Sequence, residues 1–152
     1  MGQLMDFYAG DATRIGEAFA RRDYQTLTNP EAVVLHTDFS LHVTSIDLDI
    51  LTELAAGLAG GGPTSFEGSW EQRLSGDGNE SSAEVMSRDW VDLMARSDVS
   101  RLAPAWAAAL AEEYSDPGLT VTDDMRRGLE ALTALCREAA QRGVSVVHTW
   151  SL

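Results

Sequence analysis

The chain has 152 residues, a length typical of one domain, and 44% of them are hydrophobic, so a substantial core can form. It carries 24 Asp and Glu residues against 11 Arg and no Lys, which gives a formal net charge of −13. The phosphate backbones of DNA and RNA repel such a chain, so nucleic acid is not an expected partner.

The first third of the chain predicts a strand, a helix and a second extended segment. Residues 3–8 form a short apolar run that fits an edge or buried strand. Asp11 can cap a helix in which Ile15 and Phe19 share one face. Residues 33–44 alternate between apolar and polar side chains, the pattern of a strand with one wet face. A bend inside this segment could divide it into two strands, and the sequence leaves that open.

The middle of the chain predicts a capped helix, a strand and a loop. Thr44 and Asp47 have the spacing of a capping box, so a helix should follow and end at the glycine-rich residues 60–63. Residues 65–74 alternate again, which predicts a half-buried strand. Residues 75–82 are rich in Gly, Ser, Asp and Asn, which is the composition of a loop.

The last part of the chain predicts mainly helices. Apolar stripes at helical spacing indicate helices over residues 84–96, 99–114 and 123–142. Residues 144–152 then predict a closing strand. We therefore expect a single α+β domain over residues 1–152, with three to five helices on one side of a small mixed or antiparallel sheet. The order of the strands stays open.

No catalytic, cofactor or metal motif is found in the sequence. The three histidines are His36, His42 and His148, and a straight strand would hold the first two ~20 Å apart, too far for one metal ion. Cys136 lies on the apolar stripe of its predicted helix, so we expect a buried, unreactive thiol. We predict no catalytic residue, no metal and no cofactor.

The negative charge is concentrated in the middle of the chain. Residues 46–100 contain eleven acidic residues and three Arg, a net charge of −8. Such a segment either keeps the surface hydrated or forms an acidic face for a basic partner. We expect the residues of this face to be mostly exposed: Asp47, Asp49, Glu53, Glu67, Glu71, Asp89 and Asp92.

The charge excess also predicts a response to pH. At most 11 of the 24 acidic residues can have an Arg of their own, so the others should have raised pKa values. Acidification from pH 8 toward about 5.5 would then raise the melting temperature.

The compartment follows from three further features. No apolar run approaches the ~20 residues that span a membrane. The N-terminus lacks the basic and apolar regions of a signal peptide. A single cysteine cannot form an internal disulfide. We therefore expect a cytoplasmic protein without a membrane partner, and its oligomeric state stays open.

Two stretches resemble the YfbM-like family of uncharacterised small bacterial proteins. One stretch runs from Tyr114 and Pro117-Gly118 through the helix ending at Gly143 and into residues 144–148. The other is Asp47-Leu48-Asp49 with the helix that follows it. That family usually has a Trp and a His on this helix, where the present chain has other residues: Thr52, Glu53, Ala55 and Ala56. The resemblance implies a compact α+β fold and no particular function.

Two functions compete. The first is a non-catalytic acidic interaction domain, of the immunity-protein or inhibitor kind, that binds a basic protein. It depends on the acidic middle segment and on the lack of catalytic motifs. The alternative is a small enzyme or small-molecule-binding protein, and it depends on the three histidines and four tryptophans. A deep cavity that joins a His to a carboxylate would favour the alternative, whereas a flat acidic face would favour the interaction domain.

Overall fold

The computed structural model describes residues 4–41 and 43–152. Twelve elements of secondary structure follow one another in these residues. In chain order they are β1 (Leu4–Gly10), α1 (Ala12–Arg21), α2 (Tyr24–Leu27), β2 (Val33–Asp38), α3 (Ser45–Ala59), the 3₁₀ turn η1 (Glu67–Ser69), β3 (Trp70–Gly76), β4 (Ser81–Met86), α4 (Arg88–Ala95), α5 (Val99–Glu113), α6 (Asp123–Arg142) and β5 (Ser145–Ser151).

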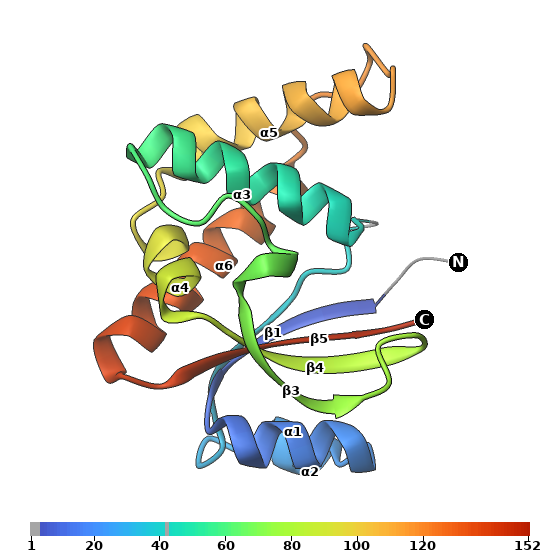
Figure 1. The fold of residues 1–152 in the computed structure, drawn as a ribbon, viewed down its shortest axis with the longest axis vertical. Helices are drawn as coiled ribbons and strands as arrows, with labels where there is room; N and C mark the ends of the chain where they lie inside the picture. Colours follow the sequence, from blue (N-terminus) through green and yellow to red (C-terminus); the bar gives the residue numbers. More distant parts are fainter. Residues whose placement is uncertain (1–3, 42) are drawn as a thin grey trace.

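The described strands form one antiparallel sheet in the order β2-β1-β5-β4-β3. The first and last strands, β1 and β5, lie side by side near its centre, as Figure 1 shows. The expected α+β class is confirmed, and so are the strands expected near the two ends of the chain. The helices number six in the described residues instead of three to five, because α2 adds a single turn.

Helices cover both faces of the sheet, so the expectation that they share one side is wrong. Figure 1 shows α1 and α2 on one face and α3 to α6 on the other. The reason lies in β1, which is apolar on both faces. Phe7 and its neighbours at every second position enter the core under α3 to α6, whereas Tyr8 packs with Ile15 and Leu27 under α1 and α2. Each apolar face therefore requires its own cover.

The helix ends agree closely with the sequence signals. Thr44 and Asp47 form the predicted capping box at the start of α3. Gly143 ends α6 with a φ of 67°, a conformation that glycine adopts without strain. The helices are therefore positioned by local chemistry as well as by the core.

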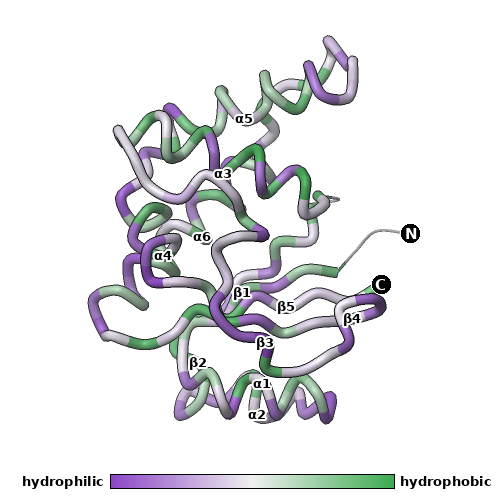
Figure 2. Tube along the Cα trace, viewed as in Figure 1, coloured by the Kyte–Doolittle hydropathy of each residue, from purple (hydrophilic) through white to green (hydrophobic). Residues whose placement is uncertain are grey.

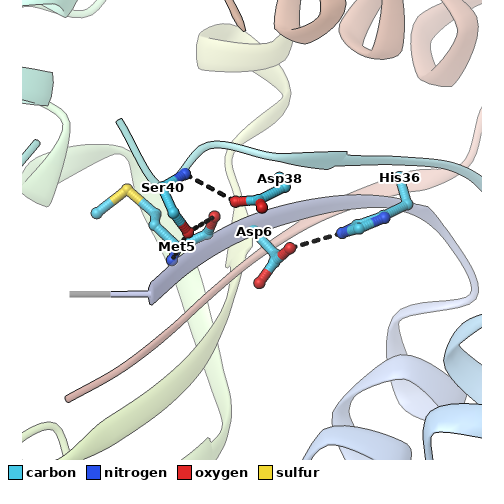
Figure 3. A network of polar contacts seen from close by, with 5 residues as sticks. All are labelled: Met5, Asp6, His36, Asp38 and Ser40. Carbon is cyan, nitrogen blue, oxygen red and sulfur yellow. Dashed lines mark hydrogen bonds and ion pairs between the residues drawn. The ribbon is translucent and has the colours of Figure 1, made fainter. Parts of the chain in front are cut away.

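The second strand ends earlier than the alternation predicts. β2 stops at Asp38, whose carboxylate accepts a hydrogen bond of 2.8 Å from the backbone N–H of Ser40 (Figure 3). The Ser40 hydroxyl in turn accepts one from the N–H of Met5 at 3.0 Å. These contacts turn the chain out of the sheet, so residues 33–44 contain one strand and a bend. His42 lies outside the described residues.

The prediction is also wrong for the segment that forms the fourth strand. Residues 81–86 form β4, although we expected a loop up to residue 82 and a helix from residue 84. Ala83, Glu84 and Met86 are good helix formers, but here they are buried in a central strand, so tertiary packing overrides their preference. The partner strand β3 is an exposed edge, and Figure 2 shows its hydrophilic residues next to the more apolar centre of the sheet.

Candidate functional site

A cavity of about 470 Å³ lies on the sheet face that α3 to α6 cover, over β3, β4 and β5. The start of α3 and the turn η1 bound it on the other side. Its volume is within the range of small-molecule sites. Aromatic and ionisable side chains lie together in its lining, namely Phe66, Trp70, Arg73, Glu84, His148 and Trp150.

The strand register places three ionisable residues in one row across the cavity floor. Arg73 of β3 pairs with Glu84 of β4, and Glu84 pairs with His148 of β5. Directly opposed residues on antiparallel strands project from the same face with Cβ atoms about 5 Å apart. The antiparallel pairing therefore brings together three residues that are far apart in the chain.

His148 is a buried polar group without a hydrogen-bond partner among the described residues. Its side chain is enclosed by Phe7 and Phe66, whose ring centroids lie 4.9 and 5.0 Å from its own, and the residue is only 2% exposed. Its Nδ1 lies 3.6 Å from Oε2 of Glu84, longer than a hydrogen bond, and neither ring nitrogen has a partner among the described residues. Burying such a group without a hydrogen bond costs free energy of folding, so its presence here suggests a functional role.

Glu84 is the carboxylate of the site, and it is 7% exposed. Its Oε1 accepts a hydrogen bond of 2.9 Å from the Ser82 hydroxyl and lies 3.6 Å from a guanidinium nitrogen of Arg73. Burial alone would raise the pKa of Glu84, but His148, Ser82 and Arg73 together outweigh it and hold the pKa below its usual value. The carboxylate is therefore ionised at neutral pH.

Arg73 is held at the edge of the cavity by an aromatic ring and a turn. Its guanidinium carbon lies 5.5 Å from the centroid of the Trp70 ring, a cation–π distance. On the other side, a Cβ on Gly78 would come within 2.8 Å of the guanidinium, so the turn between β3 and β4 packs closely against it. The cation is thus fixed next to Glu84 while its side chain stays partly exposed.

The protonation of His148 follows from these neighbours. Burial lowers the pKa of His148 below its ordinary value, although the Glu84 carboxylate opposes this effect, so the ring is neutral at pH 7. A carboxylate only accepts hydrogen bonds, so the ring proton is assigned to Nδ1, which faces Glu84. Nε2 then carries a lone pair that no described residue engages, and because the atom is buried, a ligand reaches it only if a side chain of the cavity wall moves.

The acidic residues named from the sequence do not lie in this row. Five of the seven are exposed, and they come from α3, η1, β3 and α4, namely Glu53, Glu67, Glu71, Asp89 and Asp92. None of the seven lies within 4 Å of an Arg among the described residues, where Arg pairs with acidic residues only in Arg73–Glu84, Arg126–Asp123 and Arg142–Glu138. One of the five, Glu67, also reaches the cavity rim.

Asp47 and Asp49 have structural roles, and the expectation that Asp47 is exposed is wrong. Asp47 is 3% exposed, because its carboxylate accepts hydrogen bonds of 2.6 Å from both the Thr44 N–H and the Tyr114 hydroxyl. Asp49 is half-buried and accepts hydrogen bonds from the N–H groups of Phe66 and Glu67, which fixes η1 over the cavity. Both carboxylates therefore position elements of the fold.

His36 belongs to a different environment from His148. Its Nε2 lies 2.6 Å from Oδ1 of Asp6 (Figure 3). Its ring stacks on Tyr8, with the ring centroids 4.6 Å apart. This pair is partly exposed and lies on the α1 side of the sheet, away from the cavity. It provides a useful reference histidine for experiments on His148.

Three other features bear on function. Cys136 is fully buried, as expected, and burial raises the pKa of its thiol, so it is not a nucleophile at neutral pH. Within residues 4–41 and 43–152, no three His, Cys, Asp or Glu side chains are grouped so that they could hold a metal ion. The helices in these residues are all too short or too polar to cross a membrane.

The row was missed at the sequence level for one reason. Residues 144–152 do predict a strand, and its alternation places His148 on one face with Val146 and Trp150. Glu84, however, lies in β4, where the sequence predicts a loop and a helix, so the sequence does not indicate its pairing with His148. If residues 81–86 were recognised as a strand, the sequence would indicate that Glu84 and His148 can lie side by side in the sheet.

Comparison with known proteins finds a weak structural similarity. The fold is weakly similar to that of YfbM. YfbM is a protein of unknown function from Escherichia coli, known from a crystal structure. The match covers 98% of this chain and 99% of that chain, with 14% sequence identity and a TM-score of 0.46. The resemblance expected from the sequence is thus confirmed as a weak one, and it gives no information about function. No protein-family model and no curated protein matches the chain.

Proposed function

We propose that this protein binds a small molecule in the cavity over β3, β4 and β5. The observation that supports this function best is the buried imidazole of His148, which lines the cavity and has no hydrogen-bond partner among the described residues. A ligand that reaches His148 would satisfy its hydrogen bonds and remove the cost of burying it. Of the two functions considered from the sequence, this one now has the stronger support.

The composition of the cavity agrees with a binding role. Phe66, Trp70 and Trp150 supply apolar and aromatic walls, while the row of Arg73, Glu84 and His148 supplies a few polar groups. Aromatic walls together with a few converging polar groups are found in small-molecule sites. The lone pair of His148, held next to an ionised carboxylate, could also serve as a general base, so catalysis on the bound molecule is compatible with this arrangement.

A fragment screen by ligand-observed NMR tests the proposal. We expect fragments that bind the wild type to lose at least about tenfold in affinity with H148F, which keeps an aromatic ring but removes both nitrogens. H36F is the matched control, because His36 lies outside the cavity, and it should bind as the wild type does. E84Q provides a second variant if H148F folds poorly. A screen without hits, or hits that neither cavity variant weakens, would refute the proposal.

The acidic interaction domain is the second candidate, and one observation favours it. The five exposed residues of the predicted acidic face have no Arg within 4 Å among the described residues, so their charge is available to a basic protein. We propose an immunity-protein or inhibitor-like role on this basis, in the cytoplasm. Asp47 and Asp49 are left out of this surface because they are engaged within the fold.

Charge-neutralised variants test the second candidate. One variant replaces the middle acidic residues: E53Q, E67Q, E71Q, D89N and D92N. A control variant replaces five exposed acidic residues of α5, α6 and the segment between them: E112Q, E113Q, D116N, D124N and E130Q. Calorimetric titration with basic proteins encoded by neighbouring genes should show salt-sensitive binding that only the first variant weakens. Equal weakening by both variants would mean that net charge alone attracts the partner.

A further inference from the structure

The cavity next to His148 also carries information about the class of its ligand. We propose that it takes a neutral, planar heteroaromatic molecule that donates an N–H hydrogen bond to His148. This inference rests on the small-molecule function proposed above and specifies the chemistry of the ligand. Three properties of the lining support it: its charge, its free hydrogen-bonding atom and its aromatic surfaces.

The charge of the lining disfavours an anion. Glu67 and Glu84 each carry a negative charge, Arg73 carries a positive one and His148 is neutral, so the ionisable groups of the lining have a net charge of −1. The whole chain adds to this field with its formal net charge of −13. A carboxylate or phosphate ligand would therefore enter against repulsion, and its one possible counter-ion, Arg73, already lies next to Glu84.

A cation is disfavoured for a different reason. The position that an organic cation would prefer, over an aromatic ring and close to a carboxylate, is already taken by the guanidinium of Arg73. A second cation at this place would face the first one. The electrostatic environment thus favours a ligand without net charge.

The free atom of His148 determines what the ligand must offer. With the ring proton on Nδ1 facing Glu84, Nε2 is left as a buried acceptor without a partner among the described residues. A buried acceptor gains most from a ligand that donates a hydrogen bond, and a thin, flat ring with an N–H at its edge needs the smallest movement of Phe66 to reach it. The ligand should therefore have at least one N–H in its ring plane.

The aromatic surfaces favour a flat molecule. Trp70 is 36% exposed and Trp150 is half-buried, whereas the other two tryptophans are fully buried in the core. Phe66 and the planar guanidinium of Arg73 add further flat surfaces to the same lining. Any planar π-system can stack on such surfaces, so they favour a flat ligand. His148 adds the requirement that the ligand carries an N–H donor.

Three related probes test the inference. Benzimidazole is neutral, planar and carries a ring N–H. Its 1-methyl derivative lacks that N–H, and its 5-carboxylate adds a negative charge. Titrations at pH 7.5 should show benzimidazole binding at least about tenfold more tightly than either derivative. The indole N–H signals of Trp70 and Trp150 should move in ¹H–¹⁵N spectra, whereas those of Trp90 and Trp106 should not. H148F should remove the preference for benzimidazole over its 1-methyl derivative, and H36F should keep it.

The outcomes separate this inference from the proposed function. Equal binding of benzimidazole and its 1-methyl derivative, or tighter binding of the carboxylate, would overturn the ligand class while leaving the cavity as a binding site. No binding of benzimidazole at millimolar concentration would also overturn the class. If, in addition, the fragment screen finds no ligand sensitive to H148F, the small-molecule function itself is refuted.

Discussion

His148 is held neutral by burial, and this has a consequence for stability. In the unfolded chain its pKa returns to about 6.5, so below that pH the unfolded state takes up a proton that the folded state resists. Because the pKa is lowered on folding, the associated stability is present above pH 6.5 and is lost as the pH falls below it. The residue that marks the cavity is therefore also a source of acid sensitivity.

H148F should remove this sensitivity. We expect its free energy of unfolding to lie within about 1 kcal/mol of the wild type at pH 7.5, because both unpartnered nitrogens are replaced by carbon in an aromatic environment. Between pH 7.5 and 5.5 the wild type should lose up to about 1 kcal/mol more than the variant. Urea denaturation at several pH values measures both quantities. Parallel pH profiles would mean that His148 takes up its proton in the folded state as readily as in the unfolded state.

Asp47 should prove important for stability and not for partner binding. D47A leaves the Thr44 N–H and the Tyr114 hydroxyl without their acceptor and removes the capping box of α3, so we expect a loss of about 2 kcal/mol in the free energy of unfolding. Y114F removes only one of these hydrogen bonds at an exposed position and should cost about 1 kcal/mol or less. Denaturant titration of both variants checks this order, and an equal loss would contradict it.

At the scale of elements, α1 packs closely against β3 at Gly16, which lies against Leu74. A Cβ on Gly16 would lie 2.7 Å from Cβ of Leu74, an atom that cannot move without its strand. Gly57 in α3 has nothing within 4 Å of the same position. Alanine is a better helix former than glycine by up to about 1 kcal/mol. Substitution of these two helical glycines by alanine therefore distinguishes the effect of helix preference on stability from the effect of packing.

G16A and G57A should change stability in opposite directions. G57A should raise the free energy of unfolding by up to about 1 kcal/mol, since it gains helix preference without a clash. G16A should lower it by about 1 kcal/mol or more, since the steric conflict with Leu74 exceeds that gain. Thermal and urea denaturation of the two variants provide the measurement. A stabilising G16A would show that α1 can move away from β3 at little cost.

Local signals made much of the fold predictable, but the pairing of strands that are far apart in the chain could not be predicted from them. The ends of α3 and α6 follow from Thr44 and Gly143, whose capping chemistry depends only on nearby residues. β4 was missed because its residues prefer helices locally and form a strand only when β5 and β3 flank them. The site depends on that strand, so Cys136 could be judged from a helical stripe while the Glu84–His148 pair could not.

For the whole molecule, the structure favours a fall in melting temperature on acidification instead of the rise expected from the charge excess. That expectation assumed raised carboxyl pKa values, but hydrogen bonds in caps and turns lower the pKa values of Asp23, Asp38, Asp77 and Asp98, and that of Glu84 is lowered as well. Lowered values give stability that is present above the unfolded pKa of about 4 and is lost as the pH falls further. We expect the melting temperature to fall below about pH 6.5 through His148, and more steeply near pH 4. A steady rise from pH 8 to 5.5 in thermal melts would contradict this.

The most direct measurement is ¹⁵N NMR of the histidine rings during titration with fragments that bind. At pH 7 the ring of His148 should show the signals of a neutral imidazole with its proton on Nδ1. A ligand in the cavity should shift its Nε2 signal, because that atom gains a hydrogen bond, and should leave the ring of His36 unchanged. Fragments that bind the protein without any change at His148 would show that the cavity over β3, β4 and β5 is not the binding site.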